Sequence, residues 1–100
     1  MKKITIEGTF TGSVNKFAIV DIFRPNGLPD PFNSSKTFHG NFKETLKDLK
    51  PDITYNIDVS GFTTGEFDLK ISGDFEGTNP ITVHFAEDSF NPGFVIHTKH

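Results

Sequence analysis

Two histidines near the end of the chain are the side chains best suited to bind a metal. His84 lies between Val83 and Phe85, and His97 follows Ile96, so an apolar inward face would turn both histidines outward on the last two predicted strands. Side chains on paired strands come within about 5–8 Å between Cβ atoms, and imidazole is a common zinc ligand. One hypothesis is therefore a zinc-binding or pH-sensitive pair. Since the sequence fixes no third ligand, two solvated histidines are the favoured interpretation.

Acidic residues gather in two predicted loop regions. Asp68, Asp74 and Glu76 form one group, and Glu87 and Asp88 form the other. Calcium binds about six to eight oxygen ligands of this kind. Neither group has the regular ligand spacing of a dedicated calcium loop, so solvated turns are the better interpretation. We therefore expect no cofactor, with calcium or zinc as the alternative.

Phe32 and Phe90 are the aromatic residues embedded in loop-like sequence, in DPFNSS and DSFNPG. With Asn33, which begins an Asn-Ser-Ser glycosylation sequon, they form the candidate ligand-binding set. An exposed phenylalanine can anchor a partner, but the favoured alternative is that each ring fills an open end of the fold. Carbohydrate is one candidate ligand, although the chain has no Trp and one Tyr to form an aromatic platform.

Composition excludes or disfavours other kinds of chemistry. The chain has no Cys, which excludes disulfides, a thiolate nucleophile and cysteine-ligated zinc or iron–sulfur sites. No serine has the setting of a nucleophile elbow. A net charge of -3 provides no basic stripe for nucleic acid, and no run approaches the ~18 apolar residues of a membrane span. We also expect no signal peptide, because no apolar run follows Met1; the compartment stays open, with an extracytoplasmic location favoured.

Strands separated by turn residues must position these side chains. Alternation of apolar and polar residues is typical of a half-buried strand, and Ile53, Tyr55, Ile57 and Val59 alternate in this way. The predicted strands span residues 3–10, 15–24, 37–49, 53–59, 66–72, 81–85 and 94–98, with the last antiparallel to 81–85. The length supports one domain over residues 1–100, and 12 Phe indicate a core built on phenylalanine.

Two segments depart from this alternation. Residues 24–35 contain Pro25, Pro29 and Pro31, which lack backbone donors, so the segment is predicted to be a structured surface loop. Residues 43–49 carry Leu46 and Leu49 three positions apart and could form one helical turn.

A Gly-x-Phe pattern recurs at separations of 32 and 33 residues. It includes Gly8-x-Phe10, Gly40-x-Phe42 and Gly73-x-Phe75. A threefold repeat is one interpretation, and independent strand ends at which glycine permits a bend are the favoured one.

Residues 37–62 carry a spaced motif that resembles a known family. The motif residues are Gly40, Phe42, Leu46, Leu49, Pro51, Tyr55, Ile57, Val59, Gly61 and Phe62. This series is similar to the signature of transthyretin-like β-sandwich modules, especially carboxypeptidase regulatory-like domains of bacterial surface proteins. The resemblance implies a sandwich with a binding or scaffolding role. It implies no isopeptide bond, because Val59 stands where pilin-like relatives carry a glutamate, and the Tyr-Arg-Gly-Ser ending of the hydrolase branch is replaced by residues 97–100.

The sequence thus predicts an all-β, single-domain, immunoglobulin-like or transthyretin-like antiparallel β-sandwich of about seven strands. The expected function is a non-catalytic binding or scaffolding module of a bacterial cell-surface or secreted protein. Such a module would contact a protein or carbohydrate partner through loops or edge strands. The alternative is a small metal-dependent or histidine-based hydrolase that uses His84 and His97. The oligomeric state stays open.

Overall fold

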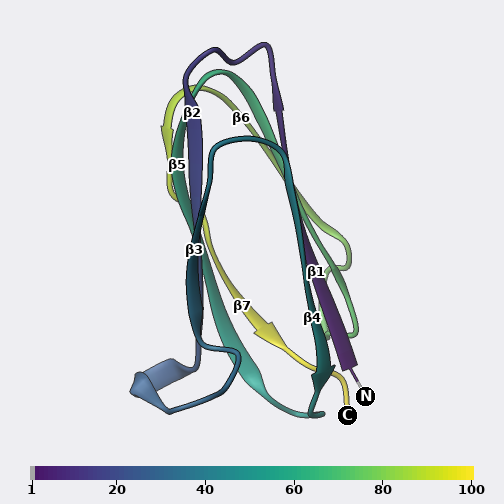
Figure 1. The fold of residues 1–100 in the computed structure, drawn as a ribbon. Coiled ribbons are helices and arrows are strands. Elements are labelled where there is room, and N and C mark those ends of the chain that lie inside the picture. Colours follow the sequence, from purple (N-terminus) through teal and green to yellow (C-terminus); the bar gives the residue numbers. More distant parts are fainter. Residues whose placement is uncertain (1) are drawn as a thin grey trace.

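The chain forms one antiparallel sheet of seven strands, shown in Figure 1. The structure is a computed structural model that describes residues 2–100. Its strands are β1 (Lys2–Thr11), β2 (Lys16–Phe23), β3 (Ser34–Phe38), β4 (Phe42–Leu49), β5 (Thr54–Gly73), β6 (Ile81–Phe90) and β7 (Gly93–His97), and a single 3-10 turn, η1 (Pro25–Gly27), follows β2. The all-β prediction is confirmed.

The 20-residue strand β5 is the spine of this sheet. Along one side, its first half pairs with β2 and its second half with β1, in registers that place Ile57 opposite Ile22 and Ile71 opposite Ile6. Along its other side, β7 pairs with residues 54–58 and β6 with residues 61–71. Strand β3 pairs with β2, and β4 pairs with β1.

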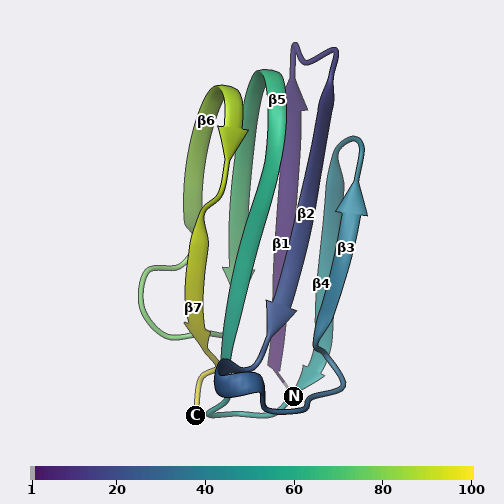
Figure 2. The same cartoon turned by 90° about the vertical axis from the view of Figure 1, so that its left-hand side faces the viewer.

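The sheet is curled into a half-barrel with two arms. We define the first arm as β3, β2, residues 54–63 of β5 and β7, and the second arm as β4, β1, residues 66–73 of β5 and β6. Figures 1 and 2 show the strands folding over at one end, where the arms meet. All seven strands belong to one hydrogen-bonded sheet, and the two-sheet sandwich stays a prediction.

Hydroxyl side chains fix the place where the sheet folds over. The Thr63 hydroxyl donates to Ser13 Oγ at 2.9 Å, and the Thr64 N–H donates to the same oxygen at 3.0 Å. The Val14 N–H in turn donates to Thr64 Oγ1 at 2.9 Å. These bonds tie the β1–β2 connection to β5 at the register shift between Thr63 and Glu66, so backbone groups freed by the bend have partners.

The concave side of the half-barrel holds the core. Alternate residues of β5 are buried, from Tyr55, Ile57 and Val59 through Phe67 to Ile71, which confirms the inward faces predicted for residues 53–59 and 66–72. The rest of the core includes Ile4, Ile6, Phe10, Ala18, Val20, Ile22, Phe42, Leu46, Leu49, Leu69, Phe75, Phe90 and Ile96. The expected phenylalanine core is present, with ring centroids of Phe67 and Phe90 4.4 Å apart.

Four element predictions are corrected. The strands expected at 53–59 and 66–72 are parts of one bent strand, β5. The strand predicted at 37–49 is interrupted at residues 39–41, and its residues 43–49 lie in strand β4 as predicted, not in the alternative helical turn. Strand β3 (Ser34–Phe38) begins inside the predicted loop. Strand β7 pairs with β5 instead of with β6, because β6 and β7 follow one another along the same edge of the long β5 strand.

The three Gly-x-Phe glycines have different structural roles, which does not support a repeat. Gly8 lies within β1, where an added Cβ would stand 2.2 Å from the Phe42 ring. Gly40 lies in the turn between β3 and β4, where a Cβ would meet nothing within 4 Å. Gly73 ends β5 with a φ of +136°, which favours glycine.

In residues 2–100 no helix is long and apolar enough to cross a membrane.

Candidate functional site

The proline-rich segment 24–33 forms a fixed loop at the end of the half-barrel opposite the fold-over point (Figure 2). Asn33 holds its two sides together. The Arg24 N–H donates to Asn33 Oδ1 at 3.0 Å, and Asn33 Nδ2 donates to the Leu28 carbonyl at 3.0 Å. Asn33 is thus a structural clamp within the loop, close to the predicted ligand residue Phe32.

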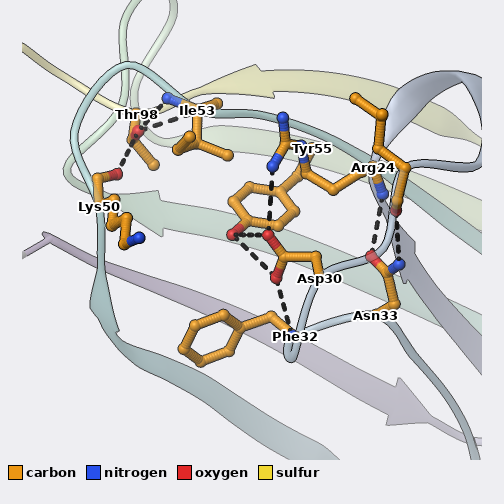
Figure 3. Close-up of polar contacts among 9 residues, drawn as sticks. Arg24, Asp30, Phe32, Asn33, Lys50, Ile53, Tyr55 and Thr98 are labelled. Atoms are coloured by element: carbon orange, nitrogen blue, oxygen red, sulfur yellow. Dashed lines mark hydrogen bonds and ion pairs between the residues drawn. The ribbon is translucent and has the colours of Figure 1, made fainter.

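Asp30 anchors this loop to the sheet, as Figure 3 shows. Its carboxylate accepts hydrogen bonds from the Tyr55 phenol at 3.1 Å and from the Phe32 N–H at 2.8 Å. Arg24 Nη1 lies 3.3 Å from Asp30 Oδ2, and the Asp30 side chain is only 10% exposed. A nearly buried carboxylate needs such partners, so Asp30 serves to fix the loop on β5.

Tyr55 is the residue of β5 that contacts Asp30. The residue is 2% exposed, and its burial, together with the negative charge of Asp30, raises the pKa of the phenol to about 12, against the opposing charge of Arg24. At neutral pH the phenol is therefore a hydrogen-bond donor. The Arg24 guanidinium carbon lies 6.0 Å from the Tyr55 ring centroid, which is the outer limit of a cation–π contact.

The chain on the other side of Tyr55 is fixed by buried Thr98. The Thr98 hydroxyl donates to the Lys50 carbonyl at 2.8 Å and accepts from the Ile53 N–H at 2.8 Å (Figure 3). Residues 50–53, the corner between β4 and β5, are therefore hydrogen-bonded to Thr98, the residue that directly follows β7. The loop is thus bonded to β5 itself, and the corner is bonded to the residue that follows β7, a strand that pairs with β5.

A cavity of about 390 Å³ lies between the loop and this corner. Its apolar lining residues are Pro29, Pro31, Phe32, Ile53 and Tyr55, and its polar ones are Arg24, Asp30, Asp48 and Lys50. Arg24 Nε is buried and has no hydrogen-bond partner among residues 2–100. A mostly apolar cleft with a few polar groups, within roughly 300–1,000 Å³, is typical of a small-ligand site.

The structure does not bring the two predicted metal-site histidines together. His84, on β6, lies opposite Asp68 of β5, whereas His97, on β7, lies opposite Thr54 at the start of β5. The expected cross-strand pair is corrected because β6 and β7 both pair with β5. Within residues 2–100, no three His, Asp or Glu side chains are grouped so as to hold a metal ion; calcium or zinc binding stays a prediction.

Each histidine instead has acidic or hydroxyl neighbours of its own. His84 Nδ1 lies 2.7 Å from Asp68 Oδ1, and His84 Nε2 lies 3.5 Å from Glu66 Oε1. The hydrogen bond to Asp68 raises the pKa of His84. His97 Nδ1 lies 2.8 Å from Thr54 Oγ1. His84 and Asp68 also line an open groove of about 400 Å³ on the outer face of the second arm.

The two predicted ligand phenylalanines lie in different surroundings. Phe32 is half-buried and forms part of the cavity wall. Phe90 is 4% exposed and stacks on Phe67 in the core. The prediction of an exposed anchor at Phe90 is therefore corrected, and the alternative that its ring fills the fold holds.

One of the predicted acidic residues, Asp74, makes a hydrogen bond to the backbone of β1: Asp74 Oδ2 accepts the Lys3 N–H at 3.0 Å.

Sequence reasoning missed Arg24, Asp30 and Lys50 as site residues and treated Tyr55 only as one of the alternating residues of a half-buried strand. One signal was available: an acid between two prolines, six residues after an arginine that directly follows a strand, can fold back to form an ion pair. The contact of Asp30 with Tyr55 spans 25 residues and has no signal in local spacing.

No family model, no curated protein and no solved structure matches this chain. The functional proposal is therefore based on the loop, the corner and the cavity between them.

Proposed function

We propose that this protein is a non-catalytic binding module that contacts a protein or carbohydrate partner through the cavity between loop 24–33 and the corner 50–53. The single observation that carries the proposal is the attachment of both walls to the sheet: the loop is bonded to β5 through Asp30 and Tyr55, and the corner is bonded to Thr98, which directly follows β7. Walls that are already ordered lose little conformational entropy when a ligand binds, which favours affinity.

The state of the polar groups favours binding over chemistry. Both oxygens of Asp30 already accept hydrogen bonds or an ion pair, so this carboxylate is occupied in holding the loop. The Tyr55 phenol keeps its proton to well above neutral pH, because its pKa is raised to about 12. These groups stabilise the shape of the cavity, and its apolar walls provide contact area.

We also propose that the curled sheet is a transthyretin-like or immunoglobulin-like sandwich variant, of the kind found in carboxypeptidase regulatory-like modules of bacterial cell-surface or secreted proteins. The support is local. Tyr55, Ile57 and Val59 of the resembling motif point into the core, and the Lys50–Ile53 corner that precedes them is fixed by Thr98. An adhesion role would follow from this membership and rests on it.

The alternative function is a histidine-based or metal-dependent hydrolase. Its support is the 2.7 Å contact between His84 Nδ1 and Asp68 Oδ1, because a carboxylate that orients an imidazole is part of general-base catalysis. The groove beside this pair is open, and the pair lies on the outer face of the second arm, away from the loop cavity.

A glycan and peptide panel tests the proposed function. The 15N-labelled protein is titrated with each compound, and backbone amide shifts are followed by NMR. We expect binding to shift resonances of residues 24–33 and 48–55, and we expect Phe32→Ala to weaken it. Val14→Ala is the control, because Val14 is 87% exposed at the opposite end of the half-barrel. Shifts confined to the surroundings of His84 would contradict the proposal and favour the alternative.

A further inference from the structure

Four strands of the curled sheet have an edge that pairs with no other strand of residues 2–100: β3, β4, β6 and β7. A free edge offers backbone N–H and C=O groups to another chain, so proteins usually protect it. Strand β4 carries four charged residues, and β7 is only five residues long. On β3, Lys36 points inward, opposite buried Val20. Charge, shortness and an inward lysine are all known protections of an edge.

The edge of β6 over residues 81–86 has none of these protections. Its sequence there is Ile-Thr-Val-His-Phe-Ala, with no Lys, Arg, Asp or Glu. The strand is regular up to this point and then bends, because Glu87 and Asp88 have left-handed backbones at φ +58° and +65°. Figure 2 shows β6 at the border of the sheet. Six successive residues of high β propensity and low charge are typical of a segment that pairs with another chain.

The inner side chains of this edge are also incompletely covered. Ile81, Val83 and Phe85 are only half-buried, whereas their direct partners on β5 are at most 1% exposed. The apolar inner face of the second arm therefore loses its cover at β6, where the sheet ends. A further strand on this edge would place its own inward side chains beside these three residues and remove them from water.

The pattern of β6 fits a second copy of β6. Directly opposite residues of an antiparallel pair point to the same face of the sheet, so apolar positions need apolar partners. A two-fold axis at Val83 places Ile81 opposite Phe85 of the second copy, and Val83 opposite its own counterpart. On the outer face, Thr82 then lies opposite His84 of the second copy. Each residue from 81 to 85 thus meets a side chain of its own polarity.

Charge favours the same register. With the axis at Val83, the acidic residues 87–88 of each copy lie toward the uncharged residues 78–79 of the other, so no like charges face one another. An axis at His84 would place two histidines opposite each other, which repel when both are protonated. The charged edge of β4 and the inward Lys36 of β3 offer β6 no such match.

We propose that this protein forms a symmetric homodimer through antiparallel pairing of residues 81–86 of two copies, with the two-fold axis at Val83. The pairing joins the second arms of both copies into one continuous sheet, and the same surface of each copy forms the interface. This inference goes beyond the proposed function. None of residues 81–86 lines the loop cavity, so either proposal can fail without the other.

Sedimentation velocity over a range of protein concentrations measures the association. We expect a monomer–dimer equilibrium, with hydrogen exchange of residues 81–86 slowed as the dimer forms. Val83→Lys places two like charges opposite each other at the axis, so we expect it to weaken the dimer at least tenfold. Val95→Lys is the matched control, because Val95 is 73% exposed on the other edge strand, β7, and its dimer should stay within twofold of the wild type.

A single cysteine tests the axis and keeps the inference testable if Val83→Lys does not fold. The chain has no Cys, so oxidation of Val83→Cys with copper phenanthroline joins only two copies of residue 83. Directly opposite Cα atoms lie about 4.5–5.5 Å apart, which suits a disulfide. We expect Val83→Cys to cross-link at least tenfold faster than Val14→Cys, since Val14 is 87% exposed at the opposite side of the fold-over point and reports random collisions.

Several outcomes would overturn the inference. A monomer at every concentration would do so, as would equal cross-linking of Val83→Cys and Val14→Cys. A dimer that Val95→Lys weakens more than Val83→Lys would place the interface on β7 instead. If an alternating Val-Thr peptide pairs with residues 81–86 of a protein that stays monomeric, the edge takes a foreign strand and not a second copy. Ligand binding at the loop cavity is a separate result, because none of these outcomes depends on it.

Discussion

The phenol of Tyr55 gives a direct test of the loop attachment. Because its pKa is raised to about 12 in the folded protein, against about 10 for an unperturbed tyrosine, the unfolded chain loses this proton first. The stability that this difference contributes is fully present below pH 10 and is lost as the pH rises through 12. We expect phenolate absorbance of the native protein to appear only near pH 12.

Asp30→Asn is the matched variant for this prediction. It removes the negative charge beside the phenol, so we expect the pKa of Tyr55 to fall while burial still keeps it above 10. Since Tyr55 is the only tyrosine, the absorbance titration reports this one group. An ordinary pKa in the native wild-type protein would contradict the buried contact with Asp30.

His84 provides the second residue-scale test. The Asp68 hydrogen bond raises the pKa of His84, and the more distant charge of Glu66 adds to the effect. A raised histidine pKa stabilises the folded state at pH values below about 6.5, and this contribution is lost as the pH rises through the folded pKa. By NMR titration we expect Asp68→Asn to lower the pKa of His84 more than Glu66→Gln does. Equal effects would contradict the 2.7 Å contact.

At the same scale, the sequence predicted residue orientation better than residue partners. His84 does face outward, as alternation along the strand requires, but its neighbour is Asp68 because β6 pairs with β5. Phe90 was expected at a loop and lies in the core, since β6 continues to that residue. Alternation within a strand is local information, whereas partners depend on strand order, which local spacing does not encode.

At the scale of elements, loop 24–33 should be ordered by two separable contacts. The Phe32 N–H donates to Asp30 Oδ1, and the Arg24 N–H donates to Asn33 Oδ1. We expect Asp30→Ala to speed hydrogen exchange most strongly at the Phe32 amide, and Asn33→Ala to do so at the Arg24 amide, because each loses its acceptor. If both variants affect the two amides equally, the loop opens as one unit and the separate contacts are contradicted.

The elements themselves were predictable to different degrees. The apolar alternation of residues 53–59 and 66–72 predicted both parts of β5. The Thr63-Thr64-Gly65 link between them has a turn-like composition, so the sequence predicted two strands where the structure has one bent strand. Strand β3 has the sequence Ser-Ser-Lys-Thr-Phe, which shows no apolar alternation. It forms because its backbone pairs with the edge of β2, and such tertiary pairing outweighs local propensity.

At the scale of the whole molecule, the inward side chains of β3 and β4 close one side of the half-barrel. The rings of Phe38 and Phe42 stack with centroids 4.4 Å apart, and Lys36 Nζ lies 3.1 Å from Glu44 Oε2. This exposed ion pair contributes little stability in itself, typically about 0–1 kcal/mol. Inward-pointing charges on edge strands do, however, discourage pairing with another chain.

Phe67 is the centre of a phenylalanine cluster that connects the four strands of the second arm, and its removal should test the whole architecture. The ring is fully buried and lies 4.6 Å from Phe10, 6.3 Å from Phe42 and 4.4 Å from Phe90 between centroids. Truncating a buried phenylalanine to alanine costs about 3–5 kcal/mol, out of a total of about 5–15 kcal/mol for a typical domain. By urea denaturation we expect Phe67→Ala to lose much of the free energy of unfolding.

Phe17→Ala is the matched control, because Phe17 lies on the outer face of β2, opposite Phe62, and is 36% exposed. Much of its ring already contacts water, so we expect this variant to lose about 1 kcal/mol or less. Phe67→Leu keeps most of the buried volume and should lose less than Phe67→Ala, which gives a measurable variant if the alanine protein does not fold. Equal losses at Phe17 and Phe67 would mean that the phenylalanine cluster does not hold the curled sheet together, and the half-barrel would then depend on its hydrogen-bonded strands alone.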